Sequence, residues 1–268
     1  MTAASPVPAR NLRWAALTAL FRRDIVVTGR ELWAFLAQVL LQPLATLFIF
    51  GRVLPGIGMA SPQYARILMP GILVLTIVLT ALQSTAMPLV IDFGWTKEIE
   101  DRLLAPLPVA WVALEKVLFA AARGMVAGAM MIGLGIVVVG AHSVSLTAAN
   151  LGAVAAYAVL AALVGGSVGL TLGTLVQPQQ LNMMFALILT PMLFTGCTQY
   201  PWASLNHLRW FQLLTLLNPI TYASEGMRAV MMPGLNHLNA VYVLPALGAA
   251  IAGFGWIGMR GFARRAVG

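Results

Sequence analysis

Acidic residues with helical spacing mark the segment 92–115, which holds five of the eight acids of this 268-residue chain. Lys97 stands four residues before Asp101, and Glu98 stands four before Arg102. This spacing places oppositely charged side chains next to each other on a helix. The segment therefore predicts a short charged helix that must lie in water, because the chain on both sides of it is almost continuously apolar.

The same helix carries an apolar face. Trp95, Ile99 and Leu103 also fall four residues apart, and so share one side. Pro106 and Pro108 end the helix, since a residue that precedes proline avoids the helical region. The pattern predicts an amphipathic helix over 95–104. It is either a docking element for a partner on that side of the membrane or a helix that only connects two spans.

Other chemistry is sparse. Neither of the two lysines follows a glycine-rich loop, so the chain lacks the phosphate-binding motif of an ATPase. The three histidines are far apart in the sequence, and the single cysteine has no partner in the chain. We expect no metal site, no cofactor bound by this chain and no catalytic set of serine, histidine and acid.

Three charged residues lie within or beside apolar stretches. Arg123 falls inside an apolar run, where it lines a polar path, pairs with Asp92 or Glu115, or extends to the headgroups. Glu225 and Arg228 lie one turn apart and are expected to pair, in a structural role rather than as a proton relay.

Composition explains why these charges stand out. The chain is 60% hydrophobic and only 9% charged, against roughly 25% charged in a typical soluble domain. No Asp, Glu, Lys or Arg occurs between Arg123 and Arg209. A bilayer crossing takes about 20 apolar residues, so the chain is predicted to be an all-α integral membrane protein. The formal charge of +8 fits bases gathered at membrane edges better than nucleic-acid binding.

Six transmembrane helices are predicted, with breaks at Gly51-Arg52 and at 55–58 after the first. The fifth is short for a full crossing, and an irregular stretch with half-helices follows it. The predicted spans are 32–50, 68–91, 110–140, 149–176, 181–195 and 241–259.

Domain organisation and orientation follow from the spans and the bases. Residues 1–31 are predicted to be cytoplasmic, with an interfacial amphipathic helix over 12–30. Residues 32–259 form the membrane domain, and 260–268 form a cytoplasmic tail. Bases are more numerous on the side of the two termini, which places that side in the cytoplasm.

Small residues recur at four-residue spacing in two spans. Gly165, Gly169 and Gly173 lie in the fourth, and Gly124 and Gly128 lie in the third. Small residues at this spacing let helices approach closely. We interpret them as internal packing rather than as a dimer face.

The chain resembles the membrane subunits of type-2 ABC exporters, which include the daunorubicin-type drug, polysaccharide and lipo-oligosaccharide export permeases. The resemblance rests on three stretches in order, and it covers nearly the whole chain. These are Glu98–Pro108 with Leu114–Val117, Pro191–Gly196 with Tyr200-Pro201, and Leu217–Tyr222 with Glu225–Arg228. The first stretch lacks a glycine that the family often has before its Leu-Leu pair.

The resemblance implies a mechanism. The charged helix would be a coupling helix that sits in a cleft of a cytoplasmic ATPase subunit, which binds the ATP and Mg²⁺. Two permease subunits, identical or related, would pair around a path lined by the first, second and fifth spans. The implied coupling residues are Trp95, Lys97, Glu98, Ile99, Glu100, Asp101, Arg102 and Leu103. The 196–232 stretch would form re-entrant half-helices that cap the outer end of the path. The implied outer-gate residues are Tyr200, Trp202, Phe211, Asn218, Pro219, Glu225 and Arg228.

The predicted function is the permease subunit of an ATP-dependent exporter in the bacterial plasma membrane, with a hydrophobic drug-like or lipid-linked substrate. Two other functions are alternatives. An ion-coupled secondary transporter would use Arg123 or Glu225, but the chain lacks an internal repeat and mid-span acids. A membrane enzyme acting on lipids would need a convergent catalytic set, which the sequence does not offer.

Overall fold

The computed structural model describes residues 37, 39–61, 63–96, 108–140, 144–180, 183 and 185–267 of the chain. Every regular element in these ranges is helical, and none of them is a strand. The predicted interfacial helix and most of the predicted coupling helix lie outside the described residues. After a first helix that begins near Val39, the elements are η1 (Ile49–Val53), α2 (Leu54–Gly56), α3 (Tyr64–Ile91), η2 (Asp92–Thr96), α5 (Val109–Val139), α6 (Leu151–Leu175), η4 (Pro178–Gln180), η5 (Phe185–Leu189), α8 (Thr190–Thr195), η6 (Trp202–Leu205), α9 (Arg209–Thr215), α10 (Pro219–Met231) and α11 (Ala240–Val267).

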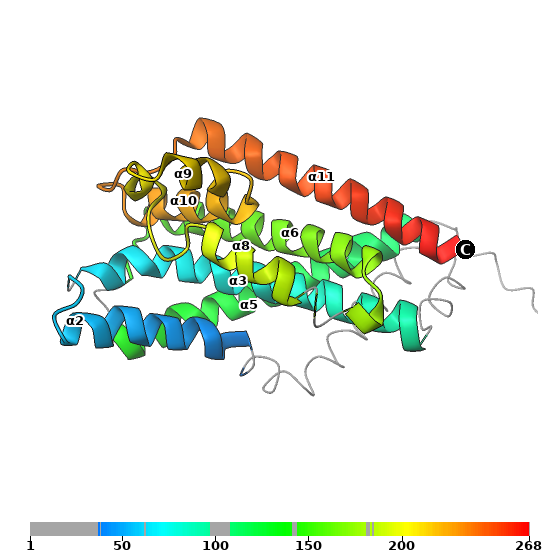
Figure 1. Ribbon diagram of the computed structural model, residues 1–268, viewed down its shortest axis with the longest axis horizontal. Coiled ribbons are helices and arrows are strands. Elements are labelled where there is room, and N and C mark those ends of the chain that lie inside the picture. Colours follow the sequence, from blue (N-terminus) through cyan, green and yellow to red (C-terminus); the bar gives the residue numbers. More distant parts are fainter. Residues whose placement is uncertain are drawn as a thin grey trace, which may run out of the picture.

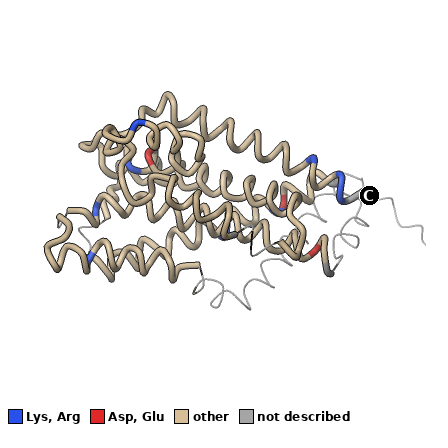
Figure 2. The backbone as a smooth tube through the Cα atoms, in the orientation of Figure 1, with Lys and Arg blue, Asp and Glu red and all other residues tan. Residues whose placement is uncertain are grey.

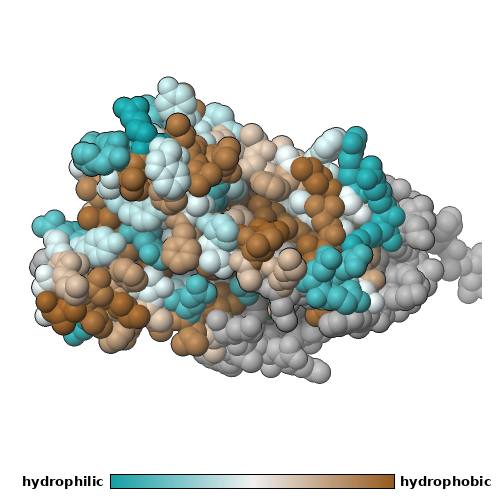
Figure 3. Space-filling model, viewed as in Figure 1, coloured by the Kyte–Doolittle hydropathy of each residue, from teal (hydrophilic) through white to brown (hydrophobic). Residues whose placement is uncertain are grey.

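Five helical stretches in the described part of the chain are long and apolar enough to cross a membrane. These are Val39–Gly56, Tyr64–Gly94, Ala110–Val139, Leu151–Leu175 and Ala240–Arg265. In Figure 1 these helices run along the long axis of the molecule, with the short elements α9 and α10 at one end and the C-terminus at the other. The surface is apolar along much of its length, and hydrophilic residues gather toward the ends (Figure 3).

Helix α3 forms the centre of the bundle. It packs against α5, α6 and α10. In the span Tyr64–Gly94, 89% of an apolar 18-residue stretch is buried within the chain. This burial disagrees with the expectation that the second span lines a path, because its side chains are covered by other helices of the same chain. Helix α11 is the least enclosed of the five, since only 11% of the corresponding stretch of Ala240–Arg265 is buried.

Glycines set the contacts between α3 and its neighbours. A Cβ at Gly169 would lie 2.5 Å from the Leu82 carbonyl oxygen, and one at Gly173 would lie 2.9 Å from Leu89 Cβ. On α5, Gly124 and Gly128 meet Ile77 in the same way. The prediction that these small residues serve internal packing is confirmed, since they bring the α3 backbone close to α5 and α6.

The first predicted span ends later than expected. Its helix does not break at Gly51 but continues through the π-helical turn η1 and through α2 to Gly56. A π-helical turn inserts an extra residue into the hydrogen-bond ladder, just before Pro55, whose missing N–H would otherwise interrupt that ladder. The chain reverses only at Gly58, whose φ of 78° suits glycine.

Two other spans also differ in length from the prediction. Helix α11 continues past Met259 to Val267, because Phe262 is buried against Leu89 and Val112 and anchors its last turns. The predicted fifth span, 181–195, contains a shorter apolar helix, Ala186–Thr195. It combines the π-helical turn η5 with α8, and Pro191 stands in the first turn of α8.

Candidate functional site

A buried ion pair forms the centre of the candidate site, which we call the hairpin (residues 190–239). Glu225 and Arg228 lie one turn apart on α10, and both side chains are fully buried. The Arg228 Nη1 group donates to Glu225 Oε1. The predicted pairing of these two residues is thus confirmed, and both partners are enclosed within the protein.

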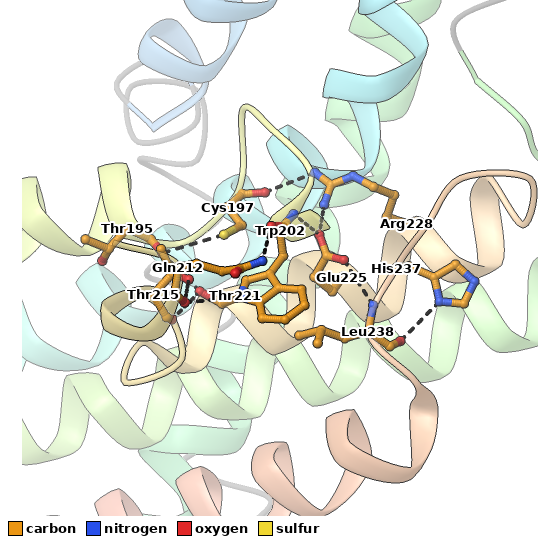
Figure 4. A network of polar contacts seen from close by, with 10 residues as sticks. All are labelled: Thr195, Cys197, Trp202, Gln212, Thr215, Thr221, Glu225, Arg228, His237 and Leu238. Carbon is orange, nitrogen blue, oxygen red and sulfur yellow. Dashed lines mark hydrogen bonds and ion pairs between the residues drawn. The ribbon is translucent and has the colours of Figure 1, made fainter. Parts of the chain in front are cut away.

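The Glu225 carboxylate joins three parts of the hairpin (Figure 4). Its Oε1 also accepts from the backbone N–H of Trp202 at 3.0 Å, and its Oε2 accepts from the N–H of Leu238 at 3.2 Å. Hydrogen bonds to a charged acceptor are stronger than neutral ones. One side chain therefore ties α10 both to the loop that precedes α9 and to the loop that leads into α11.

Arg228 holds a strained loop residue. Its Nη2 group donates to the Cys197 carbonyl at 3.0 Å. Cys197 has a φ of 50°, the one positive value at a non-glycine residue among those described. Such a conformation costs of order 1–3 kcal/mol and persists only where its surroundings impose it. Arg228 supplies such a constraint, while its Nε is buried without a hydrogen-bond partner in the described part of the chain.

The Cys197 thiol is buried as well. Burial raises the pKa of the Cys197 thiol to about 11, so the thiol is neutral at physiological pH. A neutral buried thiol is a poor nucleophile.

Side-chain amides close the rest of the hairpin. Asn218 caps α10 by accepting from the Ile220 N–H at 3.0 Å, and its Nδ2 donates to the Met192 carbonyl at 2.7 Å. Gln212 donates to the Trp202 carbonyl, while the Trp202 indole donates to the Gln212 carbonyl, both at 3.2 Å. These bonds explain why so irregular a stretch is ordered, since its backbone groups find partners inside the protein.

The hairpin docks onto α3 and α6. A Cβ on Gly71 of α3 would overlap the Thr198 carbonyl oxygen, and the Tyr64 hydroxyl donates to the Gln199 carbonyl at 3.0 Å. On the other side, Gly226 of α10 lies so close to the Tyr157 ring that no side chain would fit between them. The loop held by Arg228 is thus fixed directly to the central helix.

The far end of α3 is fixed in a similar way. Its continuation η2 places Phe93 edge-on to Phe262 of α11, with 5.3 Å between ring centroids. Arg265 lies over the Phe93 ring at 5.6 Å and donates to the Val176 carbonyl at 3.3 Å. Gly94 packs directly against Pro178. The predicted charged helix therefore starts from a base held by α6 and α11.

The structure brings the predicted gate residues together. Tyr200 and Phe211 have ring centroids 6.5 Å apart, and the Tyr200 hydroxyl donates to the Phe194 carbonyl. Of the other predicted gate residues, Trp202, Glu225 and Arg228 belong to the network of Figure 4. Asn218 caps α10, and Pro219 is the first residue of that helix.

The remaining predicted residues are placed less fully. Of the coupling residues only the backbone of Trp95 is described, and residues 97–103 lie outside the described ranges. Arg123 is half-buried near the middle of α5, about two turns from Lys116. Its roles in lining a path, pairing or reaching headgroups stay predictions. Among the described residues, no cluster of histidine, cysteine or acidic side chains could hold a metal ion.

Sequence reasoning missed several residues of the site. Gly71, Gln212 and Cys197 contribute through close approach, an amide and a backbone carbonyl, and none of these has a distinctive sequence pattern. Gly71 could have been found from its place beside Pro70 inside an apolar span, since a glycine there indicates a close contact.

The long apolar helices and the enclosed polar network define the chain as a multi-span helical membrane protein with a structured hairpin at one end. A family model described as ABC-2 type transporter matches residues 15–232. The chain therefore belongs to the ABC-2 type transporter family, as the resemblance indicated, and it is a membrane transport protein.

A named relative supports this membership. The chain is 28% identical over 255 residues to the inner membrane transport permease YadH of Escherichia coli strain K12, and the match covers 91% of this chain and 93% of that protein. The same identity and coverage hold for YadH of Shigella flexneri.

Proposed function

We propose that the chain is the membrane subunit of an ATP-binding-cassette exporter in the bacterial inner membrane. A separate ATPase subunit pair binds ATP and Mg²⁺ and supplies the energy, and a second permease subunit completes the path. The cargo is hydrophobic or amphipathic, such as a drug-like or lipid-linked molecule. The chain crosses the membrane six times with both termini in the cytoplasm, so the hairpin lies at the outer face. Membership in the family and the likeness to an inner membrane permease support this proposal.

The continuity of α3 carries the proposal furthest. Tyr64–Ile91 is one helix, about 42 Å long at 1.5 Å per residue. Its first turns hold the hairpin loop through Tyr64 and Gly71. Its other end passes through η2 into the predicted coupling helix. A push on that helix by a closing ATPase would therefore reach the hairpin through a single buried rod.

The hairpin serves as an outer gate that moves with α3. The Glu225–Arg228 pair joins three segments of the hairpin, so these segments move as one piece rather than opening separately. Tyr200, Trp202 and Phe211 lie in the same unit. Opening then requires a shift of α3 against its neighbours, which ATP-driven closure of the partner would supply.

The alternative function, an ion-coupled secondary transporter, would need an acid that can release and rebind a proton. Glu225 is poorly suited to that role. Both of its oxygens accept hydrogen bonds, and Arg228 neutralises its charge. These contacts favour a structural role.

Co-purification and transport test the proposal. A tagged chain should bring down an ATPase subunit, and the double variant Glu98→Arg/Asp101→Arg should lose that subunit and ATP-dependent transport in proteoliposomes. Arg209→Glu, which reverses an exposed charge at the hairpin end, serves as the control. Unchanged transport in the double variant would contradict the proposal. Transport that an uncoupler abolishes while ATP persists would favour the ion-coupled alternative.

A further inference from the structure

A stripe of three exposed side chains runs along the last turns of α11. Trp256, Arg260 and Arg264 fall four residues apart, and this spacing puts them on one face of the helix. Trp256 is 56% exposed and both arginines are exposed. The next residue, Arg265, points inward to Val176 and Phe93. The stripe is thus separate from the contacts that hold α11 to the bundle.

The stripe lies at the height of the lipid headgroups. Helix α11 carries no charged residue from Ala240 to Met259, a length of about 30 Å at 1.5 Å per residue. That length matches the hydrocarbon core of a bilayer, about 30 Å. Arg260 is then the first charged side chain beyond the hydrocarbon. Trp256 lies one turn deeper, where aromatic residues border the core.

Among the described residues, no exposed acidic side chain opposes the positive charge of the stripe. The described acidic side chains, Asp92, Glu115 and Glu225, are all buried, so the exposed charge of the described surface is basic. Figure 2 shows Lys and Arg on the C-terminal turns of α11. Because α11 is the least enclosed of the five long helices, this basic stripe borders the bilayer.

The geometry of Arg260 suits a phosphate. Its guanidinium lies over the Trp256 ring, 3.7 Å from the ring centroid. Stacking uses the flat face of the guanidinium and leaves its N–H groups, which lie in its plane, free to bind two oxygens of one anion. Arg264 stands one turn further along the same exposed face and adds a second positive charge.

We propose that Trp256, Arg260 and Arg264 form a binding site for the phosphate headgroup of an anionic phospholipid, whose acyl chains lie along the exposed apolar side of α11. The site adjoins Arg265 and hence Phe93 at the base of the predicted coupling helix. If the chain works with an ATPase as proposed above, lipid bound here stabilises the contacts of Phe93 at the start of the predicted coupling helix and raises coupled ATPase activity.

Native mass spectrometry of the delipidated, detergent-purified chain tests the site directly. The probes are phosphatidylglycerol and phosphatidylcholine of matched acyl chains. Wild type should retain phosphatidylglycerol preferentially. Each arginine near the surface contributes about a fivefold gain in affinity for anionic lipid. Arg260→Gln/Arg264→Gln should therefore bind phosphatidylglycerol about 25-fold more weakly, with phosphatidylcholine binding unchanged.

Two control variants separate this site from net charge and from misfolding. Arg66→Gln/Arg209→Gln removes two exposed arginines at the hairpin end and should bind phosphatidylglycerol as wild type does. Arg260→Lys/Arg264→Lys keeps the charge but loses the stacked guanidinium, so its affinity for phosphatidylglycerol should lie between those of wild type and the glutamine variant. Circular dichroism melting confirms that each variant folds.

Several outcomes would overturn the inference. They are equal binding of the two lipids by wild type, unchanged phosphatidylglycerol binding in the glutamine variant, and an equal loss in the hairpin-end control. If Arg260→Gln/Arg264→Gln lost an ATPase subunit or a second copy of the chain but kept its lipid binding, the two arginines would belong to a protein contact instead. The lipid measurement needs no ATPase, so it stands even where co-purification fails.

Discussion

Replacing Arg228 by glutamine should open the hairpin at Cys197. The substitution removes the donor to the Cys197 carbonyl and leaves the Glu225 carboxylate buried without its guanidinium. Breaking a buried pair by removing one partner costs about 3–5 kcal/mol, a large part of the total stability of about 5–15 kcal/mol that folded domains have. For a chain of this size, each kcal/mol of lost stability lowers the midpoint of thermal unfolding by about 2–4 °C, so that midpoint should fall by about 6–20 °C.

The chain offers its own probe for this change. Cys197 is its single cysteine and is buried in the hairpin. A thiol-reactive dye that fluoresces on reaction therefore reports opening at the loop that Arg228 holds. Circular dichroism at 222 nm reports loss of helix throughout the bundle. In Arg228→Gln the dye transition should fall further than the helix transition, because the hairpin is released before α3 and α6 separate.

A double-variant cycle identifies the ion pair as the cause. Glu225→Gln should destabilise the chain by a similar amount, because it leaves Arg228 buried and unpaired. The double variant Glu225→Gln/Arg228→Gln should lose less than the sum of the two, by about 1–3 kcal/mol, since neither charge then remains. Arg209→Gln, at an exposed site, should change neither transition. Additive effects, or single losses below about 1 kcal/mol, would refute the role we assign to the pair.

Three further predictions concern the same hairpin. Gly71→Ala should destabilise the hairpin, because the added methyl group overlaps the Thr198 carbonyl. Gly56→Ala should not, because its added methyl group contacts nothing, and the temperature at which the thiol dye reacts with Cys197 should fall only in the first variant. Asn218→Ala should lower stability by about 1 kcal/mol or more through loss of the α10 cap, measured by circular dichroism against Asn218→Ser, which retains a capping oxygen. Native Cys197 should react slowly with maleimide at pH 8. Cys197 is buried, and burial raises the pKa of its thiol to about 11, so both access and thiolate formation oppose the reaction in the folded chain. A native rate close to that of the denatured chain would contradict that environment.

Periodicity predicted much of the fold because bilayer helices are specified by length and apolar composition. The second to fourth spans and the start of the sixth were placed within a few residues. The glycine spacing correctly predicted close internal packing of the third and fourth spans, and the structure shows that their partner is α3. Helix ends were less predictable. The π-helical turn before Pro55 and the burial of Phe262 both depend on tertiary contacts that leave no local pattern.

The candidate site was predicted in part. The spacing of Glu225 and Arg228 indicated their pairing, and the resemblance to the family implied which residues of the hairpin form the predicted gate. The partners of that pair could not be predicted, because they are backbone groups of Trp202, Cys197 and Leu238. A backbone group carries no residue signature, and only the folded loop brings it within reach. The side chains of the predicted coupling helix lie outside the described residues, so their docking face stays a prediction.

The arrangement of buried charge bears on how such a transporter can move. An enclosed ion pair contributes little net stability compared with apolar side chains of similar size, but separating its two charges is costly. A gate built around such a pair has few partly open states, because each would leave a charge uncompensated. In the proposed mechanism, the hairpin therefore either stays closed or shifts as one piece together with α3. That all-or-none behaviour would let a small displacement at η2 produce a complete change at the opposite end of the bundle.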